Sequence, residues 1–296
     1  MKKDYFYPPF SFLAPEPQFT PYEPARIVIL PVPYDATTTA RAGARGGPAA
    51  IIHASQDLEP YDLTLGFDTT HHGIHTLPDL APHSDSPKAM VDRIESVVSD
   101  LLDDGKFVVT LGGEHTVSIG AVRAHVRRFP DLSVLAIDAH ADVRDEYLDS
   151  RYNHACPLRR IVEVCPVVQV GMRSASPDQL EFIRERDLTF LTPAAYRALA
   201  GGPRDVVEKL SPNVYVDIDL DGIDPSQMAA VGTPEPGGLF WDELMELLTA
   251  LAEERRIVGF DLMELAPDLG PPACAALAAR LAQRLIGLAL GPHVSS

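Results

Sequence analysis

Three side chains that can bind metal ions stand at every second position of one short stretch: Asp138, His140 and Asp142. The stretch follows the apolar run 132–135, which is typical of a buried parallel strand. Side chains alternate between the two faces of an extended backbone, so these three groups can point into one pocket. A solvated strand end with a lone core histidine is the alternative interpretation, and a short motif alone does not exclude it.

A second stretch, residues 213–225, places four aspartates within eight residues on an apolar strand, at positions 217, 219, 221 and 224. Carboxylates are almost never buried without a partner, so a positive charge is expected beside them. By the same alternation Asp217, Asp219 and Asp221 share one face, and those nearest the strand end would reach the pocket.

Further ligand-type residues follow two other predicted strands. The strand at 107–111 stops at a pair of glycines, and His115 stands at the junction with the next helix, which it could instead cap. The last predicted strand, 256–262, is followed directly by Glu264. Because α/β proteins bind ligands at the ends of parallel strands, these residues are expected at one edge of a sheet.

The candidate ligands are two imidazoles and four carboxylates: His115, Asp138, His140, Asp142, Asp219 and Asp221. Crowded carboxylates repel one another unless they are neutralised, and two divalent cations would balance four of them. An oxygen-rich set with a minority of histidines suits manganese better than zinc. Two ions close together make hydroxide available near neutral pH, so the pattern predicts a hydrolase.

The elements that must position these residues alternate along the chain. Strands are predicted to begin at residues 25, 107, 132, 167, 188, 213 and 256. Helices are predicted to open at Pro48 and to cover 88–102, 177–186, 192–200, 241–253 and about 272–288, with another ending near residue 129. This alternation predicts a parallel sheet covered by helices on both faces.

Composition limits the class of protein and its partners. The chain has 296 residues, 46% of them hydrophobic, which suits one α/β domain with a large core. Its net charge of -17 argues against nucleic acid and anionic membrane surfaces and favours a cationic ligand. Cys156, Cys165 and Cys274 form no CxxC motif, so neither a disulfide framework nor a zinc ribbon is expected and a cytoplasmic location fits.

Residues 1–24 form a proline-rich arm whose aromatic residues are expected to dock on the body or on a neighbouring subunit: Tyr5, Phe6, Tyr7 and Phe10. No signal peptide is expected there. No segment is expected to span a bilayer, since even 275–290 contains Arg280 and Arg284. A loop at 62–84 holds four histidines at spacings that match no metal geometry and is interpreted as surface: His71, His72, His75 and His83.

Several motifs together resemble the ureohydrolase family of arginase, agmatinase and their relatives. The resemblance covers the chain from Pro31 to the last helix and leaves only the arm outside. It rests on Gly112-Gly113-Glu114-His115, Asp138-Ala-His140-Ala-Asp142, Asp219-Leu-Asp221-Gly-Ile-Asp224-Pro225, Gly232-Thr-Pro-Glu-Pro-Gly-Gly238 and Glu264.

The resemblance implies a three-layer α/β/α fold with a central, mostly parallel sheet, in a single catalytic domain over 25–296. It also implies two Mn²⁺ ions per subunit. Asp138 and Asp219 would bridge the ions, with His115 and Asp142 completing the ligands of one ion and His140 and Asp221 those of the other. Asp217 stands where the family often has a small residue and is left out of this set.

The implied reaction is attack of hydroxide on a guanidinium carbon, followed by collapse of a tetrahedral intermediate to urea and an amine. Asp142 would accept or pass a proton, and His154 would shuttle protons to the leaving amine or to bulk water. Glu264 would pair with the guanidinium group. Without the resemblance, His154 is an ordinary loop histidine.

The substrate is the finer question, and agmatine, converted to putrescine and urea, is the favoured interpretation. Arg144 stands where arginase-type enzymes have an asparagine, and the surrounding loop is similar to that of bacterial agmatinases. The Arg144 guanidinium could instead bind a carboxylate, as in guanidinobutyrate, so a guanidino-acid hydrolase or an arginase stays an alternative.

Two other classes remain open at this stage. One is a metal-binding protein without turnover. The other is a two-metal hydrolase for phosphoesters or acyl-amines, which would need a positive substrate clamp where Glu264 supplies the opposite charge. The family usually forms trimers or hexamers, so a homo-oligomer is expected.

Overall fold

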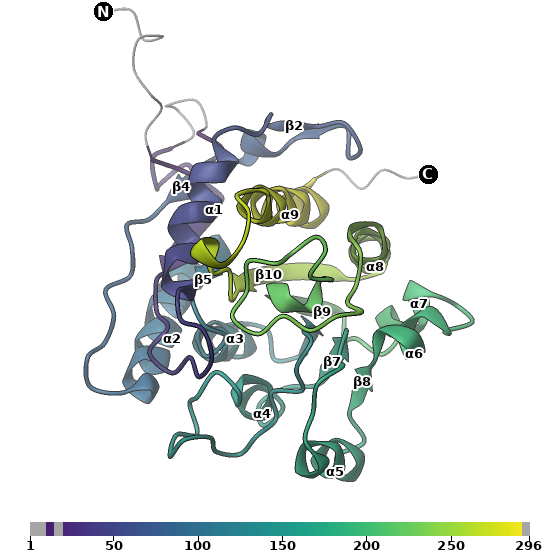
Figure 1. Cartoon of the computed structure of the whole chain (residues 1–296). Helices are drawn as coiled ribbons and strands as arrows, with labels where there is room; N and C mark the ends of the chain where they lie inside the picture. The colour runs from purple at the N-terminus through teal and green to yellow at the C-terminus, as the bar shows by residue number, and fades with distance from the viewer. Residues whose placement is uncertain (1–9, 15–19, 292–296) are drawn as a thin grey trace, which may run out of the picture.

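The architecture is a fully parallel eight-stranded sheet between two layers of helices (Figure 1). The computed structural model describes residues 10–14 and 20–291. In spatial order the strands are β4 (Ile74–Thr76), β1 (Ile27–Val32), β5 (Phe107–Gly112), β10 (Arg256–Met263), β9 (Asn213–Asp219), β6 (Leu132–Ile137), β7 (Val167–Val170) and β8 (Thr189–Leu191). Neighbouring strands all pair in parallel, so the predicted α/β/α class is confirmed.

Helices cover both faces of the sheet (Figure 1). One layer holds α1 (Gly47–Ser55), α8 (Trp241–Glu254) and α9 (Ala273–Leu290). The opposite layer holds α2 (Pro87–Asp103), α3 (Val117–Arg128), α4 (Pro157–Ile161) and α5 (Pro177–Glu185). Near β8 lie the short helices α6 (Pro193–Arg197) and α7 (Pro203–Val207). The remaining elements are the hairpin β2 (Tyr61–Asp62) and β3 (Phe67–Asp68) and the 3₁₀ helices Ala44–Gly46, Thr69–His72, Leu220–Gly222 and Pro267–Leu269.

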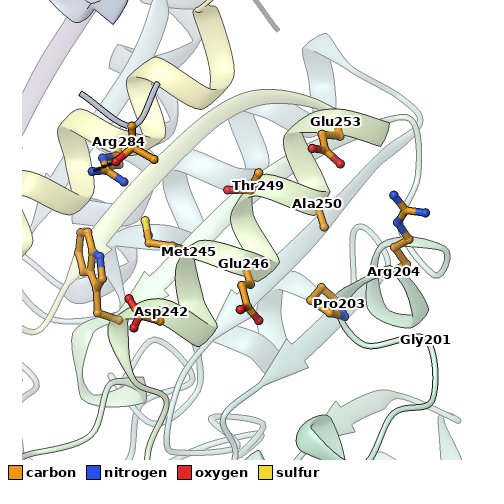
Figure 2. Close-up of a pocket in the computed structure, with 12 residues that line it drawn as sticks. Gly201, Pro203, Arg204, Asp242, Met245, Glu246, Thr249, Ala250, Glu253 and Arg284 are labelled. Carbon is orange, nitrogen blue, oxygen red and sulfur yellow. Dashed lines mark hydrogen bonds between the residues drawn. The ribbon is translucent and has the colours of Figure 1, made fainter. Parts of the chain in front are cut away.

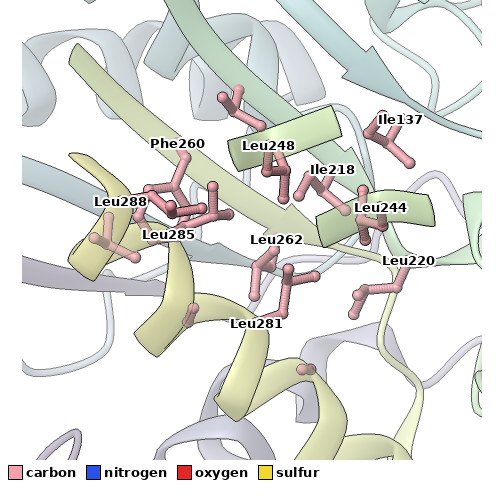
Figure 3. Close-up of a cluster of buried hydrophobic side chains, with 14 of the residues drawn as sticks. Ile137, Ile218, Leu220, Leu244, Leu248, Phe260, Leu262, Leu281, Leu285 and Leu288 are labelled. Carbon is pink, nitrogen blue, oxygen red and sulfur yellow. The ribbon is translucent and has the colours of Figure 1, made fainter. Parts of the chain in front are cut away.

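Alternation along the strands divides the core into two layers. On β9 and β10, Ile218, Phe260 and Leu262 face α8 and α9 and are fully or almost fully buried there (Figure 3). Tyr215 on β9 belongs to the opposite layer, which packs under α2 and α3. The even-numbered residues of β9 therefore pack under α8 and α9. Its odd-numbered residues, including Asp217 and Asp219, lie on the face of the sheet that α3 covers.

Most predicted elements lie where the sequence places them, within a few residues. Thr192, the first residue of the predicted helix 192–200, is the N-cap of α6 and accepts a hydrogen bond from the backbone N–H of Ala195 at 3.1 Å. The edge strand β4 and the hairpin of β2 and β3 were not predicted, because each strand has only two or three residues. Such short strands give no periodic hydrophobic pattern to recognise.

The expectation that no segment is apolar enough to span a bilayer is wrong for α9. This 18-residue helix has a mean hydropathy of 1.4 and passes a test of length and composition in spite of its two arginines. In the structure 56% of that window is buried, and the helix packs against α1 and β10. The composition of α9 is thus that of a helix buried in the core.

The described part of the N-terminal arm docks on the body through Phe12 and Leu13. Both side chains are buried, and their backbone N–H groups donate to Thr76 Oγ1 and Ser55 Oγ, each at 2.9 Å. Phe10, predicted to dock on the body or on a neighbouring subunit, is 59% exposed and does not dock on the body, whereas Phe12 is buried. Tyr5, Phe6 and Tyr7 lie outside the described residues.

Truncation of a core side chain between the sheet and its helices should lower the free energy of unfolding in proportion to how deeply that side chain is buried. Leu248 of α8 is fully buried, so Leu248→Ala should lower the free energy of unfolding by about 2–5 kcal/mol. The matched control is Leu180→Ala on α5, where the side chain is 42% exposed and the change should be within about 0.5 kcal/mol. Denaturant titration measures both, and equal effects would contradict this assignment of the core.

Candidate metal centre

The predicted ligands gather at the carboxyl end of four adjacent strands in the middle of the sheet. The strands are ordered β5, β10, β9, β6, although β5 and β6 are consecutive in that part of the chain. His115 follows β5, Asp138 follows β6 and Asp219 ends β9. Glu264 follows β10. The insertion of β9 and β10 between β5 and β6 brings residues from four distant segments to one place.

Two glycines allow the backbones at this edge to approach closely. A Cβ atom on Gly113 would lie 2.0 Å from the carbonyl oxygen of Tyr34, and one on Gly222 would lie 2.8 Å from the backbone nitrogen of Asp138. In both cases the neighbour is backbone, which has little freedom to move away. Any other residue would therefore displace the loops that hold His115 or Asp221.

The first ligand group surrounds the Nδ1 atom of His115. Carboxylate oxygens of Asp142, Asp138 and Asp219 lie 3.1, 3.4 and 3.4 Å from this nitrogen. His115, Asp138 and Asp219 are buried, and their ligand-type atoms lie within 4.8 Å of one another. One nitrogen and several carboxylate oxygens thus converge on a volume that suits a cation.

The second group shares Asp138 and adds His140 and Asp221. The His140 Nδ1 atom lies 2.9 Å from one oxygen of Asp221 and 3.9 Å from one of Asp138. The Asp221 carboxylate also accepts hydrogen bonds from the Ala139 backbone N–H at 3.0 Å and from Thr233 Oγ1 at 3.1 Å. Two adjacent groups with one common carboxylate have the arrangement expected of a two-ion site.

The route by which these side chains reach the site differs from the predicted alternation along a strand. Strand β6 ends at Ile137, and Asp142 is reached through a turn in which its own φ is +48°. Asp221 lies in the 3₁₀ helix Leu220–Gly222 and not in extended backbone. Glu264 also has a left-handed φ, of +67°. Residues other than glycine rarely adopt this conformation, and such strained positions cluster at functional sites.

The donor set fits divalent cations. The Oδ2 atom of Asp138 is fully buried and has no hydrogen-bond partner in the part of the chain that the structure describes. Burial, and then the charges of Asp142 and Asp221, raise the pKa of Asp138 well above its usual range. Burial, and then Asp221 and Asp138, do the same to the pKa of Asp219. A bound cation would remove both causes of instability, because it neutralises the charges and is coordinated by the oxygen that lacks a hydrogen-bond partner.

The pKa values of the two histidines are raised by the neighbouring carboxylates, against the effect of burial. Burial alone would lower the pKa of His140, but the hydrogen bond and charge of Asp221 outweigh it and raise the pKa to about 10. Burial also lowers the pKa of His115. The charge of Asp217, followed by hydrogen bonds to the neighbouring aspartates, outweighs burial and raises this pKa well above its usual range. In the metal-free protein, protons therefore supply part of the positive charge that the carboxylates need.

Beside these groups, His154 and Glu264 form a second polar cluster. The His154 Nδ1 atom lies 3.6 Å from Glu264 Oε1, and its Nε2 atom lies 2.8 Å from Thr39 Oγ1. Glu264 Oε1 also accepts a hydrogen bond from the backbone N–H of His115 at 2.8 Å. The predicted substrate residues His154 and Glu264 thus stand next to the first ligand group.

Sequence reasoning missed the residues that hold this cluster in place. Glu114 accepts hydrogen bonds from the Thr37 backbone N–H at 2.6 Å and from Thr37 Oγ1 at 2.7 Å, and Thr37 Oγ1 accepts from the His154 backbone N–H at 2.9 Å. Burial raises the pKa of Glu114 to about 7, against the effect of these hydrogen bonds. The signal was available, because the loop that carries Thr37 and Thr39 follows the first strand at the ligand-binding edge.

Arg144 and the loop histidines make their contacts elsewhere. The Arg144 guanidinium stacks over the Tyr147 ring, 5.0 Å from its centroid. His72 Nε2 contacts the carbonyl oxygen of Leu290 at 2.8 Å, and His75 Nδ1 contacts that of Thr20 at 2.5 Å. Neither metal-type group found among the described residues includes a histidine of the 62–84 loop, in which His71 is exposed and the other three histidines are half-buried.

A separate surface pocket of about 770 Å³ lies along α8, between Arg204 of α7 and Arg284 of α9 (Figure 2). Met245 and Glu246 of α8 line it. None of the predicted site residues contributes to its wall. This pocket is therefore not part of the metal centre.

Comparison with known proteins gives a consistent result. The model of the family described as "Arginase family" matches residues 25–287. The chain is 38% identical over 290 residues to N(1)-aminopropylagmatine ureohydrolase of Synechocystis sp., covering 94% of each chain. It is 33% identical to agmatinase of Bacillus anthracis, covering 90% of this chain and 91% of the relative. The solved agmatine ureohydrolase of Thermoplasma volcanium superposes with a TM-score of 0.83 at 34% identity, covering 91% of both chains.

Binding of metal should release protons and strengthen as the pH rises. Without metal, His140 keeps its proton up to about pH 10, and Asp138 and Asp219 are protonated well above their usual range. The affinity for Mn²⁺ should therefore be clearly higher at about pH 8 than at about pH 6. Calorimetry in two buffers of different ionisation enthalpy measures the proton release. An affinity independent of pH, with no protons released, would contradict the assignment.

Proposed function

The chain belongs to the arginase family of guanidino hydrolases, and on that premise we propose that its substrate is agmatine or agmatine extended by an aminopropyl group. Water would cleave the bond between the guanidinium carbon and the alkyl nitrogen, giving urea and putrescine or its aminopropyl derivative. The observation that supports this most is the pair of metal-type groups joined by Asp138, with Glu264 and His154 beside them.

Each of the two ligand groups described above would bind one metal ion. His115, Asp142, Asp138 and Asp219 would hold one ion, and His140, Asp221, Asp138 and Asp219 the other. The oxygen-rich donor set supports Mn²⁺, two per subunit. When bound, the ions supply nucleophilic hydroxide near neutral pH and offset the negative charge of the site.

Glu264 would orient the substrate. Its Oε1 atom is held by the backbone N–H of His115, and no contact among the described residues uses its Oε2 atom. A carboxylate oxygen in this position can accept from a guanidinium N–H in a charge-assisted hydrogen bond. Since Glu264 itself is fixed in a left-handed backbone conformation, the substrate would be held against a rigid partner.

Asp142 and His154 would move protons. The Asp142 carboxylate lies 3.1 Å from His115 Nδ1 and its side chain is 11% exposed, so it can accept a proton at the edge of the first ligand group. Burial lowers the pKa of His154, but Glu264 outweighs burial and raises it above its usual value. The protonated form of His154 is therefore favoured, and it would donate its proton to the leaving amine.

The far end of the substrate is inferred to be cationic. The chain has a net charge of -17, and Arg144, which the guanidino-acid alternative assigns to a substrate carboxylate, is stacked on Tyr147. Among cationic substrates the aminopropyl derivative has support of its own. Relatives named N(1)-aminopropylagmatine ureohydrolase reach 38% and 41% identity, and relatives named agmatinase reach 33% and 35%.

The arm at 1–24, the catalytic domain at 25–296, a homo-oligomeric state as a trimer or hexamer and a cytoplasmic location stay predictions. The family match over residues 25–287 supports the boundary of the domain. Light scattering on the purified protein measures the oligomeric state.

The substrate can be identified by urea release from the Mn²⁺-loaded protein. Agmatine and N(1)-aminopropylagmatine should both release urea, and the higher kcat/KM identifies the preferred one. Arginine, guanidinobutyrate and guanidinopropionate, which carry a carboxylate, should be poor substrates. Urea from guanidinobutyrate without urea from either cationic compound would contradict the proposal, and no urea from any compound would favour metal binding without turnover.

Removal of the His154 imidazole should affect turnover and not the metal. His154→Ala should lower kcat by about 100-fold or more, because a positioned general acid is lost. Its Mn²⁺ content should stay at the wild-type value. His71→Ala, which changes an exposed histidine of the surface loop, is the control and should leave both unchanged. A His154→Ala protein with wild-type kcat would exclude the proton-transfer role.

A further inference from the structure

We propose that Asp217 is a positioning residue that orients the His115 imidazole and strengthens binding of the ion held by the first ligand group. This inference rests on the proposed two-ion centre and goes beyond its predicted ligands, which exclude Asp217. Asp217 is fully buried on β9, two residues before Asp219.

The geometry places one imidazole between two sets of carboxylates. Both carboxylate oxygens of Asp217 lie 3.1 Å from His115 Nε2. The opposite ring nitrogen, Nδ1, faces Asp142, Asp138 and Asp219 at 3.1 to 3.4 Å. Because His115 is only 1% exposed, water cannot replace either interaction without opening the core.

The contact with Asp217 decides which ring nitrogen can bind metal. A carboxylate only accepts hydrogen bonds, so with an ion bound among the carboxylates on the Nδ1 side, the proton of a neutral His115 ring must be on Nε2, facing Asp217. The lone pair is then on Nδ1, which faces the cavity between the carboxylates. Carboxylate partners of this kind fix the tautomer of a histidine ligand and raise its basicity, and their loss typically weakens metal binding about 10- to 100-fold.

Asp217 is itself held on two sides. Ser118 Oγ, from the first turn of α3, donates to Asp217 at 3.0 Å. Asp261 is its register partner on β10 and is fixed in turn by the Tyr215 hydroxyl at 2.9 Å and by the Ile218 backbone N–H at 3.3 Å. The Asp217 carboxylate therefore has a fixed position relative to both α3 and the sheet.

The effect should be selective for one of the two ions. His140, the histidine of the second group, takes its orientation from Asp221 at 2.9 Å and has no contact with Asp217 among the described residues. Loss of the Asp217 charge should thus weaken the ion beside His115 and leave the ion beside His140 bound. A residue with only a structural role would not separate the two.

The test compares Asp217→Asn with the wild-type full-length chain by calorimetric titration with Mn²⁺ alone, checked by metal analysis after dialysis. One of two ions should bind about 10- to 100-fold more weakly in the variant, and the other should bind as in the wild type. Asp62→Asn is the control, since it changes an equally buried aspartate whose described partners are Thr64, Leu65 and Arg284, with no contact to Asp217 or His115. Both affinities of the control should stay within about 3-fold of the wild type.

Three outcomes separate the inference from the alternatives. Unchanged affinity of Asp217→Asn for both ions would overturn the inference. If the unfolding temperature of the metal-free variant also fell, the role of Asp217 would be only to anchor α3. If Asp217→Asn does not fold, Asp217→Ser replaces it, and the same selective loss is expected. A wild-type protein that binds no Mn²⁺ and releases no urea would instead contradict the proposed function, which keeps the two failures distinct.

Discussion

The buried carboxylate of Asp138 imposes the main physical constraint on this molecule. It is fully buried, one of its oxygens has no hydrogen-bond partner among the described residues, and Asp142 and Asp221 add negative charge beside it. An isolated charge in such a position is strongly unfavourable, and so is an unpaired polar atom. The arrangement becomes reasonable when a cation is bound, and Asp138 is the one residue shared by both metal-type groups.

The fold supplies what that constraint requires. Apolar layers on both faces make the sheet rigid, and the insertion of β9 and β10 between β5 and β6 brings the ligands together at its carboxyl edge. The left-handed conformations of Asp142 and Glu264 are maintained by this surrounding structure. The His115 ring lies between the metal ligands and the core, since Nδ1 faces the ligand groups and Nε2 faces the buried Asp217.

The sequence predicted the strands and the residues that follow them, because strand ends and ligand motifs are local features. It did not predict how the backbone turns after the strands, and the alternation expected for Asp142 and Asp221 is replaced by a left-handed residue and a 3₁₀ helix. The role inferred for Asp217 was also missed, since its partner is 102 residues away in the chain. The apolar composition of α9 likewise has its reason in packing that only the folded chain reveals.

The most direct test of the account is a crystal structure of the Mn²⁺-loaded protein with anomalous scattering measured at the manganese edge. The account predicts two peaks about 3.5–4 Å apart, with the Asp138 carboxylate in contact with both ions. One ion should lie beside His115 Nδ1 and the other beside His140 Nδ1. A single peak, or peaks away from Asp138, would contradict it.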